Sequence, residues 1–207
     1  MMNLDIQRLS DENRYLIDGF SCVETDEMLA RLNAKERRRI RKHSQDMEDF
    51  LRNEAYEDQE KGLSRTYLFV NDGKLVAYLA LCNDAIRLEF EERDNMELPY
   101  TTVPAVKVAR LAVSANCQGK GIGKEALQFA IYVSQMVRDY SGVVFLTLDC
   151  YEHRVGYYER FGFQRNLYQP VVLDYDSPVS MRLWIDEYLA ERSDEITESC
   201  YYSQKND

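Results

Sequence analysis

Val113-Ser-Ala-Asn-Cys-Gln118-Gly-Lys-Gly121-Ile-Gly123-Lys124 joins an apolar run to an amphipathic one through a turn that contains three glycines. The upstream run, residues 105–113, is short, mostly apolar and partly β-branched, which is typical of a buried strand. Downstream, apolar residues recur at helical spacing from Ile122 to Tyr140, and Gly142 is placed to end that helix. The sequence therefore predicts a strand, a glycine-rich turn and a helix in direct succession.

The turn has the properties of an anion-binding site. The first amides of a helix lack intrahelical partners, and the helix dipole adds partial positive charge there. Gly119, Gly121 and Gly123 would let an anion approach the backbone closely or allow positive φ. Lys120 and Lys124 add two cations, so we expect a phosphate or pyrophosphate to bind in this turn.

Other interpretations of the turn stay open or fit less well. A glycine-rich turn without a ligand is one alternative, because short glycine patterns are weak evidence. A P-loop continues from its lysine to Ser or Thr, whereas Glu125 follows Lys124 here. A Rossmann turn spaces its glycines G-x-G-x-x-G in an early strand-helix-strand unit, and this turn has neither that spacing nor that position.

Two elements together resemble one protein family. Gln118-Gly-Lys-Gly121-Ile-Gly123 resembles the acetyl-CoA pyrophosphate loop of the GNAT N-acetyltransferase superfamily. Tyr157-Tyr158-Glu-Arg-Phe-Gly162-Phe163, downstream, resembles the Tyr-Glu-x-x-Gly-Phe element of the same superfamily. The resemblance covers roughly residues 66–185 and implies an α/β fold, a GNAT-like mixed central sheet with splayed parallel strands and flanking helices.

The resemblance also implies an enzyme, a co-substrate and a set of site residues. The co-substrate would be acetyl-CoA, and the enzyme would transfer its acetyl group directly to an amine. The cofactor-binding residues carried over from the family are Leu111, Ala112, Val113, Gln118, Gly119, Lys120, Gly121, Ile122, Gly123 and Lys124. The first three would pair with the pantetheine arm through their backbone groups, and the N–H of Val113 is a candidate for stabilising an oxyanion.

Tyr158 is the predicted general acid, since a phenol donates a proton without being charged at neutral pH. A packed aromatic role suits Tyr157 better. No general base is evident, and Glu97, Asp149 or a chain of waters stay open. Many relatives carry an Asn at the position of Tyr151, so a cofactor contact there is in doubt.

The remaining patterns predict the order of elements. We expect a surface helix over residues 27–43, a second helix from Met47 that ends near Gly62, and a hairpin of residues 67–70 and 75–81 about Asp72-Gly73. An acidic connection over 88–104, a strand over 143–148, a short helix over 153–160 and a strand over 179–184 complete the order. The predicted domain spans 1–185, with an N-terminal helical part (1–66), a cofactor-binding core (67–185) and an acidic tail (186–207).

Composition limits the location and the metal chemistry. The 207 residues contain no apolar run long enough to cross a membrane and begin without a signal peptide, so we expect a cytoplasmic protein. Five cysteines without metal-type spacing and two distant histidines predict no metal site.

The acceptor is predicted mainly from charge. The net charge of −10 argues against a nucleic-acid partner and favours a primary amine of a small molecule or peptide. Residues 35–42, however, hold six cations and one carboxylate, a local charge of +5.

The N-terminal part supports other acceptors and partners. Phe20-Ser-Cys22, Asp49-Phe50-Leu51 and residues 62–67 and 79–86 resemble a GNAT subgroup that includes toxins of toxin–antitoxin modules. The alternatives are therefore a toxin-type enzyme acting on aminoacyl-tRNA, with an antitoxin partner, and a non-catalytic acyl-CoA-binding module. A homodimer also stays open.

Overall fold

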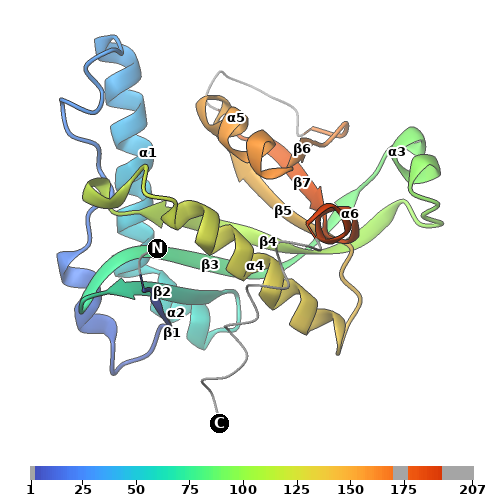
Figure 1. Cartoon of the computed structure of the whole chain (residues 1–207), viewed down its shortest axis with the longest axis horizontal. Coiled ribbons are helices and arrows are strands. Elements are labelled where there is room, and N and C mark those ends of the chain that lie inside the picture. Colours follow the sequence, from blue (N-terminus) through green and yellow to red (C-terminus); the bar gives the residue numbers. More distant parts are fainter. Residues whose placement is uncertain (1–2, 170–176, 193–207) are drawn as a thin grey trace. The chain divides into compact units, whose positions relative to one another are not determined.

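The structure is a computed structural model that describes residues 3–169 and 177–192. Its elements, in order, are β1 (Asp5–Arg8), η1 (Arg14–Gly19), α1 (Ala34–Asn53), α2 (Ala55–Glu60), β2 (Arg65–Asn71), β3 (Lys74–Arg87), α3 (Phe90–Asn95), β4 (Thr102–Val113), η2 (Ala115–Cys117), α4 (Ile122–Arg138), β5 (Phe145–Cys150), α5 (Glu152–Phe161), β6 (Gln164–Arg165), β7 (Val179–Trp184) and α6 (Ile185–Glu191) (Figure 1). Hydrogen-bonded strands follow the order β1-β2-β3-β4-β5-β7-β6, with β4 and β5 parallel. The predicted α/β class and mixed sheet are thus confirmed.

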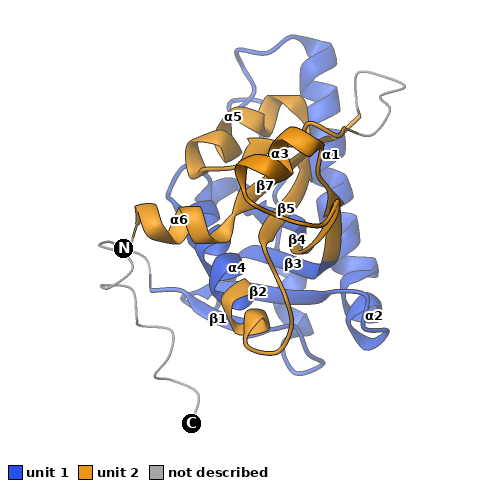
Figure 2. Cartoon of the chain, turned by 90° about the vertical axis from the view of Figure 1, so that its right-hand side faces the viewer, with its two compact units in different colours: residues 1–83, 107–133 blue, residues 84–106, 134–207 orange. Residues whose placement is uncertain are grey.

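The chain forms two compact units (Figure 2). Unit 1 comprises residues 1–83 and 107–133, and unit 2 comprises residues 84–106 and 134–207. Each unit combines two separate stretches of the chain, and strands β3 and β4 each contribute residues to both units.

The hairpin predicted in unit 1 is present. Strands β2 and β3 pair antiparallel up to Asn71 and Lys74, and the two residues between them, Asp72 and Gly73, have φ of 49° and 72°. Positive φ at both central residues defines the turn that matches the twist of paired strands, and Gly adopts it without steric cost.

The side chains of β2 alternate between two packing environments. Leu68 and Val70 belong to the core that α1 and α2 cover, whereas the rings of Tyr67 and Phe69 contact the ring of Phe129 on α4 at 4.9 and 5.8 Å between centroids. Alternation of this kind follows from the period of two in a strand. The core on the α1 side contains Leu9, Leu16, Ile17, Phe20, Cys22, Phe50, Leu51, Ala55, Leu68, Val70, Leu75, Tyr78, Ala80 and Ala112.

Helix α1 differs from the prediction of two helices around residue 45. It begins only after Asn33, whose side chain accepts the N–H of Glu36 at 3.0 Å while the Glu36 carboxylate accepts the N–H of Asn33 at 3.0 Å. This capping box fixes the start of the helix, so residues 27–33 form turns instead. The helix then continues through Ser44, whose buried hydroxyl donates to the carboxylate of Glu24 at 2.7 Å.

Unit 2 contains a second small core and an unpredicted helix. Strand β5 pairs antiparallel with β7, and β7 with β6. Within the acidic connection, Glu89 and Glu92 form a capping box that starts α3. The second core contains Ile86, Leu88, Val103, Ala105 and Phe145.

The boundaries in unit 2 differ slightly from the predicted ones. Strand β5 covers 145–150 and not 143–148, because Asp149 and Cys150 still pair with Ser180 and Val179 of β7. The predicted acidic tail begins within α6, and its part beyond Arg192 lies outside the described residues.

Candidate functional site

The glycine-rich turn lies in unit 1, where the sequence places it, between β4 and α4. A short 3-10 helix, η2, precedes it and was not predicted. Gly119 and Gly121 have φ of +75° and +87°, and a Cβ built on either would meet nothing within 4 Å. Their backbone therefore borders open space in a conformation that favours glycine. Gly123 lies within the first turn of α4.

Several hydrogen bonds fix the shape of this turn. The side-chain amide of Gln118 donates to the carbonyl of Val113 at 3.3 Å, and the ammonium of Lys120 donates to the carbonyl of Asn116 at 2.8 Å. The amides of Lys124 and Glu125 both donate to the carbonyl of Gly121. These bonds close the turn onto both flanking elements.

The amides of residues 119–123 are left for another acceptor. Among the described residues, no backbone carbonyl accepts a hydrogen bond from them. Exposed glycines, unpaired amides and the N-terminus of a 17-residue helix together form a cradle for an anion.

The backbone groups predicted to hold an extended ligand lie at the end of β4. Ala112 is buried, and Leu111 and Val113 are half-buried. The strand ends where the N–H of Ser114 donates to the carbonyl of Val76 on β3 at 2.8 Å. The end of β4 is thus anchored to β3 immediately before the cradle.

Tyr158 lies on α5 in unit 2. Its ring packs edge-to-face against the rings of Tyr157 and Phe163, with centroids 5.1 and 5.7 Å apart. Helix α5 ends at Gly162, with φ of +116°, where the amides of Gly162 and Phe163 donate to the carbonyl of Tyr158. The Gly-Phe pair of the motif therefore caps the helix and supports the tyrosine ring.

The electrostatic surroundings of Tyr158 favour its neutral form. Burial raises the pKa of the phenol above its usual value of 10, and the nearby Cys150 and Tyr157 raise it further, while Arg154 opposes them. Burial likewise raises the pKa of the Cys150 thiol to about 12, so this cysteine is not a thiolate at neutral pH. The phenol is accordingly protonated at neutral pH.

No general base is assigned by the geometry. Glu97 and Asp149 are both exposed, and Glu97 has a φ of +53° after α3. Asp84, near the end of β3, accepts a hydrogen bond from the hydroxyl of Thr147 at 2.7 Å, a contact between distant residues that no local sequence pattern indicates. Tyr151, in place of the family's Asn, stacks on His153 with centroids 6.1 Å apart.

The basic segment forms the first half of α1. Lys35, Arg38 and Lys42 are exposed, and their spacing of three and four residues places them along one face of the helix. Arg41 differs, because it donates to the carbonyl of Glu24 at 3.1 Å and to the carboxylate of Asp26 at 2.6 Å. It therefore anchors the preceding segment, and we define the basic face as Lys35, Arg38 and Lys42.

Residues 3–169 and 177–192 lack two kinds of feature. They contain no helix that is both long and apolar enough to cross a bilayer. They also contain no group of three or more His, Cys, Asp or Glu side chains arranged to hold a metal ion.

Comparison with known sequences gives two matches. The sequence model described as "Acetyltransferase (GNAT) family" matches residues 27–163. A tRNA-acetylating toxin of Mycobacterium tuberculosis is 28% identical over 131 residues, which are 61% of this chain and 77% of the toxin.

Comparison with solved structures gives the same fold. A tyrosine-to-phenylalanine mutant of KacT has a TM-score of 0.70 at 19% identity, over 92% of this chain and 99% of KacT. AtaT complexed with acetyl-methionyl-tRNAfMet has a TM-score of 0.69 at 17% identity, over 91% of this chain and 99% of AtaT.

Proposed function

The chain belongs to the Acetyltransferase (GNAT) family, and from this premise we propose that it transfers the acetyl group of acetyl-CoA to the amino group of an aminoacyl-tRNA. The class of enzyme follows from the family, and acetyl-CoA is the co-substrate that some of its structural relatives bind. The identity of the acceptor is the part that needs argument.

The cradle fits the cofactor's pyrophosphate. Its unpaired amides and the two glycines with positive φ provide donors that an anion can reach. In this proposal the pyrophosphate is held by residues 119–124, Gln118 shapes the turn, and the backbone groups of Leu111, Ala112 and Val113 hold the pantetheine arm. When bound, acetyl-CoA supplies the activated acetyl group.

Tyr158 is the proposed proton donor. During transfer the acceptor nitrogen bonds to the acetyl carbon and loses a proton, while the carbon–sulfur bond breaks and the departing thiolate gains a proton. We assign that proton to the Tyr158 hydroxyl, because Tyr158 stands at the tyrosine of the family's Tyr-Glu-x-x-Gly-Phe element and a phenol is protonated at neutral pH. The N–H of Val113 would stabilise negative charge on the carbonyl oxygen.

The single observation that carries the choice of acceptor is the sequence likeness to a tRNA-acetylating toxin. It favours aminoacyl-tRNA over the small-molecule or peptide amine that the net charge indicated. AtaT, which shares the fold, has been solved in complex with acetyl-methionyl-tRNAfMet. A mutant of AtaT has also been solved bound to the C-terminus of the antitoxin AtaR, so an antitoxin is a proposed partner of this chain as well.

The basic face gives the tRNA a place to bind. Lys35, Arg38 and Lys42 are exposed cations on one side of α1, and the structure gives none of them an ion pair with a described carboxylate. Such cations are free to contact phosphates, and each contact releases counterions from the nucleic acid.

The test is acetyl transfer from labelled acetyl-CoA to charged tRNA, uncharged tRNA, polyamines and peptide N-termini. We expect label on charged tRNA alone. Replacing Lys35, Arg38 and Lys42 together by Gln should raise the KM for tRNA and reduce the salt dependence of log K by about one for each phosphate that is no longer neutralised. Transfer to polyamines or peptides but not to charged tRNA would contradict the proposal.

A matched control removes the same charge elsewhere. Arg14 lies on η1, Lys61 directly after α2 and Lys74 at the start of β3. Arg14 and Lys61 are in exposed ion pairs, which contribute little to stability. The triple Gln variant at these positions should keep the wild-type KM for tRNA and salt dependence. Equal effects of the two triple variants would show that net charge, and not the basic face, determines binding.

A further inference from the structure

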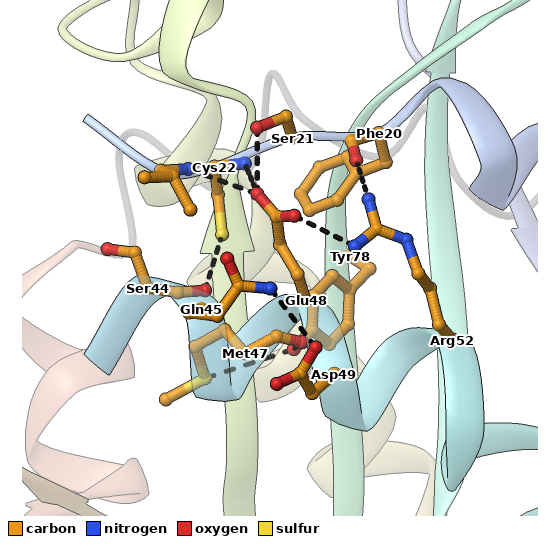
Figure 3. Close-up of polar contacts among 11 residues, drawn as sticks. Phe20, Ser21, Cys22, Ser44, Gln45, Met47, Glu48, Asp49, Arg52 and Tyr78 are labelled. Carbon is orange, nitrogen blue, oxygen red and sulfur yellow. Dashed lines mark hydrogen bonds and ion pairs between the residues drawn. The ribbon is translucent and has the colours of Figure 1, made fainter. Parts of the chain in front are cut away.

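A buried carboxylate joins helix α1 to the segment before it. Glu48 is 4% exposed, and its carboxylate accepts from the hydroxyl of Ser21 at 2.7 Å, the amides of Cys22 and Val23 at 2.8 and 3.2 Å, and Arg52 at 2.9 Å (Figure 3). The carboxylate thus joins residues 21–23 to α1, although the two segments are more than 20 residues apart in sequence.

Glu48 stays ionised in this position. Burial acts to raise its pKa, but the hydrogen bonds from Ser21, Cys22, Val23 and Arg52 outweigh burial and hold the pKa below the usual 4.5. Burying a charge is costly, and apolar residues of similar volume often stabilise a protein equally well. A charge retained in such a place points to a demand for a specific geometry.

The segment that Glu48 holds is in turn bonded to the start of the cradle. The carbonyl of Ser21 accepts the N–H of Ala115, the first residue of η2, at 2.9 Å. Arg52, besides pairing with Glu48, donates to the carbonyl of Phe20 at 2.9 Å. Ser21 therefore links Glu48 to the turn. Its hydroxyl donates to Glu48, and its carbonyl accepts from Ala115, which begins η2 just before Gln118 and the glycines.

The helix side of this link is fixed as well. The hydroxyl of Tyr78 on β3 donates to the carbonyl of Met47 at 2.8 Å, and its ring meets that of Phe20 edge-to-face at 5.7 Å (Figure 3). Tyr78 of β3 thus contacts both Met47, which precedes Glu48, and Phe20, which precedes Ser21. The carboxylate cannot follow a displaced segment without disturbing this packing.

We propose that Glu48 is a positioning residue for the acetyl-CoA cradle, acting through Ser21 on Ala115. The inference rests on the proposed function of the glycine-rich turn. A loop whose amides are already aimed at the ligand binds more tightly than one that must be ordered on binding, because less conformational entropy is lost. Glu48 itself is not proposed to contact the ligand.

The first test is the affinity for CoA of Glu48→Gln. Glutamine has the same size as glutamate but carries no charge. Its NH₂ group replaces one of the two carboxylate oxygens, so a donor would face the hydrogen-bond donors that this oxygen now accepts from. We expect the Kd for CoA, measured by calorimetry, to rise about tenfold, while kcat at saturating acetyl-CoA changes less than threefold. A lower kcat with an unchanged Kd would overturn the proposal.

The second test removes the other end of the link. Ala115→Pro deletes the N–H that Ser21 accepts; proline suits the first position of a helix, and Ser114 already has the ψ of 136° that a residue before proline prefers. Its effect on the Kd should equal that of Glu48→Gln, and the double variant should be no weaker than either single one. Additive effects would mean that the two residues act independently.

A control distinguishes positioning from general stability. Gln59 on α2 is also buried and bonded across the unit, to the carbonyl of Leu9 and the N–H of Thr66. Gln59→Leu should lower the unfolding temperature as Glu48→Gln does, yet leave the Kd for CoA unchanged; an equal rise in Kd would overturn the proposal.

If Glu48→Gln does not fold, Ser21→Ala replaces it in the same double-mutant cycle. A wild type that binds no CoA would refute the proposed function itself.

Discussion

Replacing Gly121 by Glu should weaken the binding of CoA, because it places a carboxylate in the proposed cradle for the pyrophosphate. The substitution introduces a side chain at a φ of +87°, where a residue with a Cβ costs about 1–2 kcal/mol. The surrounding space is open, since a Cβ there meets nothing within 4 Å. Steric conflict with the protein therefore adds nothing further, and the remaining effect is electrostatic.

The electrostatic part can be sized from Coulomb's law. A carboxylate about 6–8 Å from a phosphate, at an effective dielectric constant of about 20, is repelled by roughly 2–3 kcal/mol per unit charge. A loss of about 2 kcal/mol corresponds to a Kd for CoA roughly thirtyfold higher. Calorimetric titration of the folded variant with CoA measures this directly.

Gly73 provides a matched control for the backbone strain. It lies in the β2–β3 turn with a φ of +72° and equally open surroundings. Gly73→Glu should therefore lose about the same unfolding free energy as Gly121→Glu while binding CoA with wild-type affinity. If the two variants bind CoA equally well, the turn before α4 is not the pyrophosphate site and the reasoning fails.

Two further predictions concern unit 2. Tyr158→Phe should lower turnover roughly a hundredfold with little change in CoA affinity, whereas Tyr157→Phe should stay near wild type; steady-state kinetics would contradict the assignment if both lost activity equally. Glu92 and Arg182 form an ion pair in which both side chains are almost fully buried, so Glu92→Gln should cost about 3 kcal/mol in urea unfolding. Combining Glu92→Leu with Arg182→Met should recover most of that loss, and an undiminished loss would show that the pair itself stabilises unit 2.

The parts of the fold that were predicted correctly depend on neighbouring residues. The Asp72-Gly73 turn requires positive φ at two adjacent positions, and Asp-Gly is a residue pair that favours such a turn. Gly119 and Gly121 before α4 also have the positive φ that the glycine-rich turn was expected to allow. Gly123, in contrast, lies within the first turn of α4, so residue type permits positive φ but does not impose it.

The parts that were missed depend on distant partners or on unrecognised caps. The start of α1 was encoded by Asn33 and Glu36, a capping-box spacing that could have been recognised. Glu48 could not, because a glutamate in an amphipathic helix ordinarily faces solvent, and its partners, Ser21, Cys22 and Val23, lie about 25 residues upstream. Only the fold brings them together.

The net charge indicated a small amine acceptor, whereas the proposed function has an aminoacyl-tRNA, and the two differ because net charge averages over the whole sequence. Residues 186–207 hold seven carboxylates and two cations, so this stretch alone supplies −5 of the total of −10. Phosphate contacts are local, since charges are screened beyond about 8 Å at physiological salt. In the proposed function, the phosphates of a tRNA would contact the basic face of Lys35, Arg38 and Lys42 on α1, because the local positive charge acts over such distances and the net charge does not.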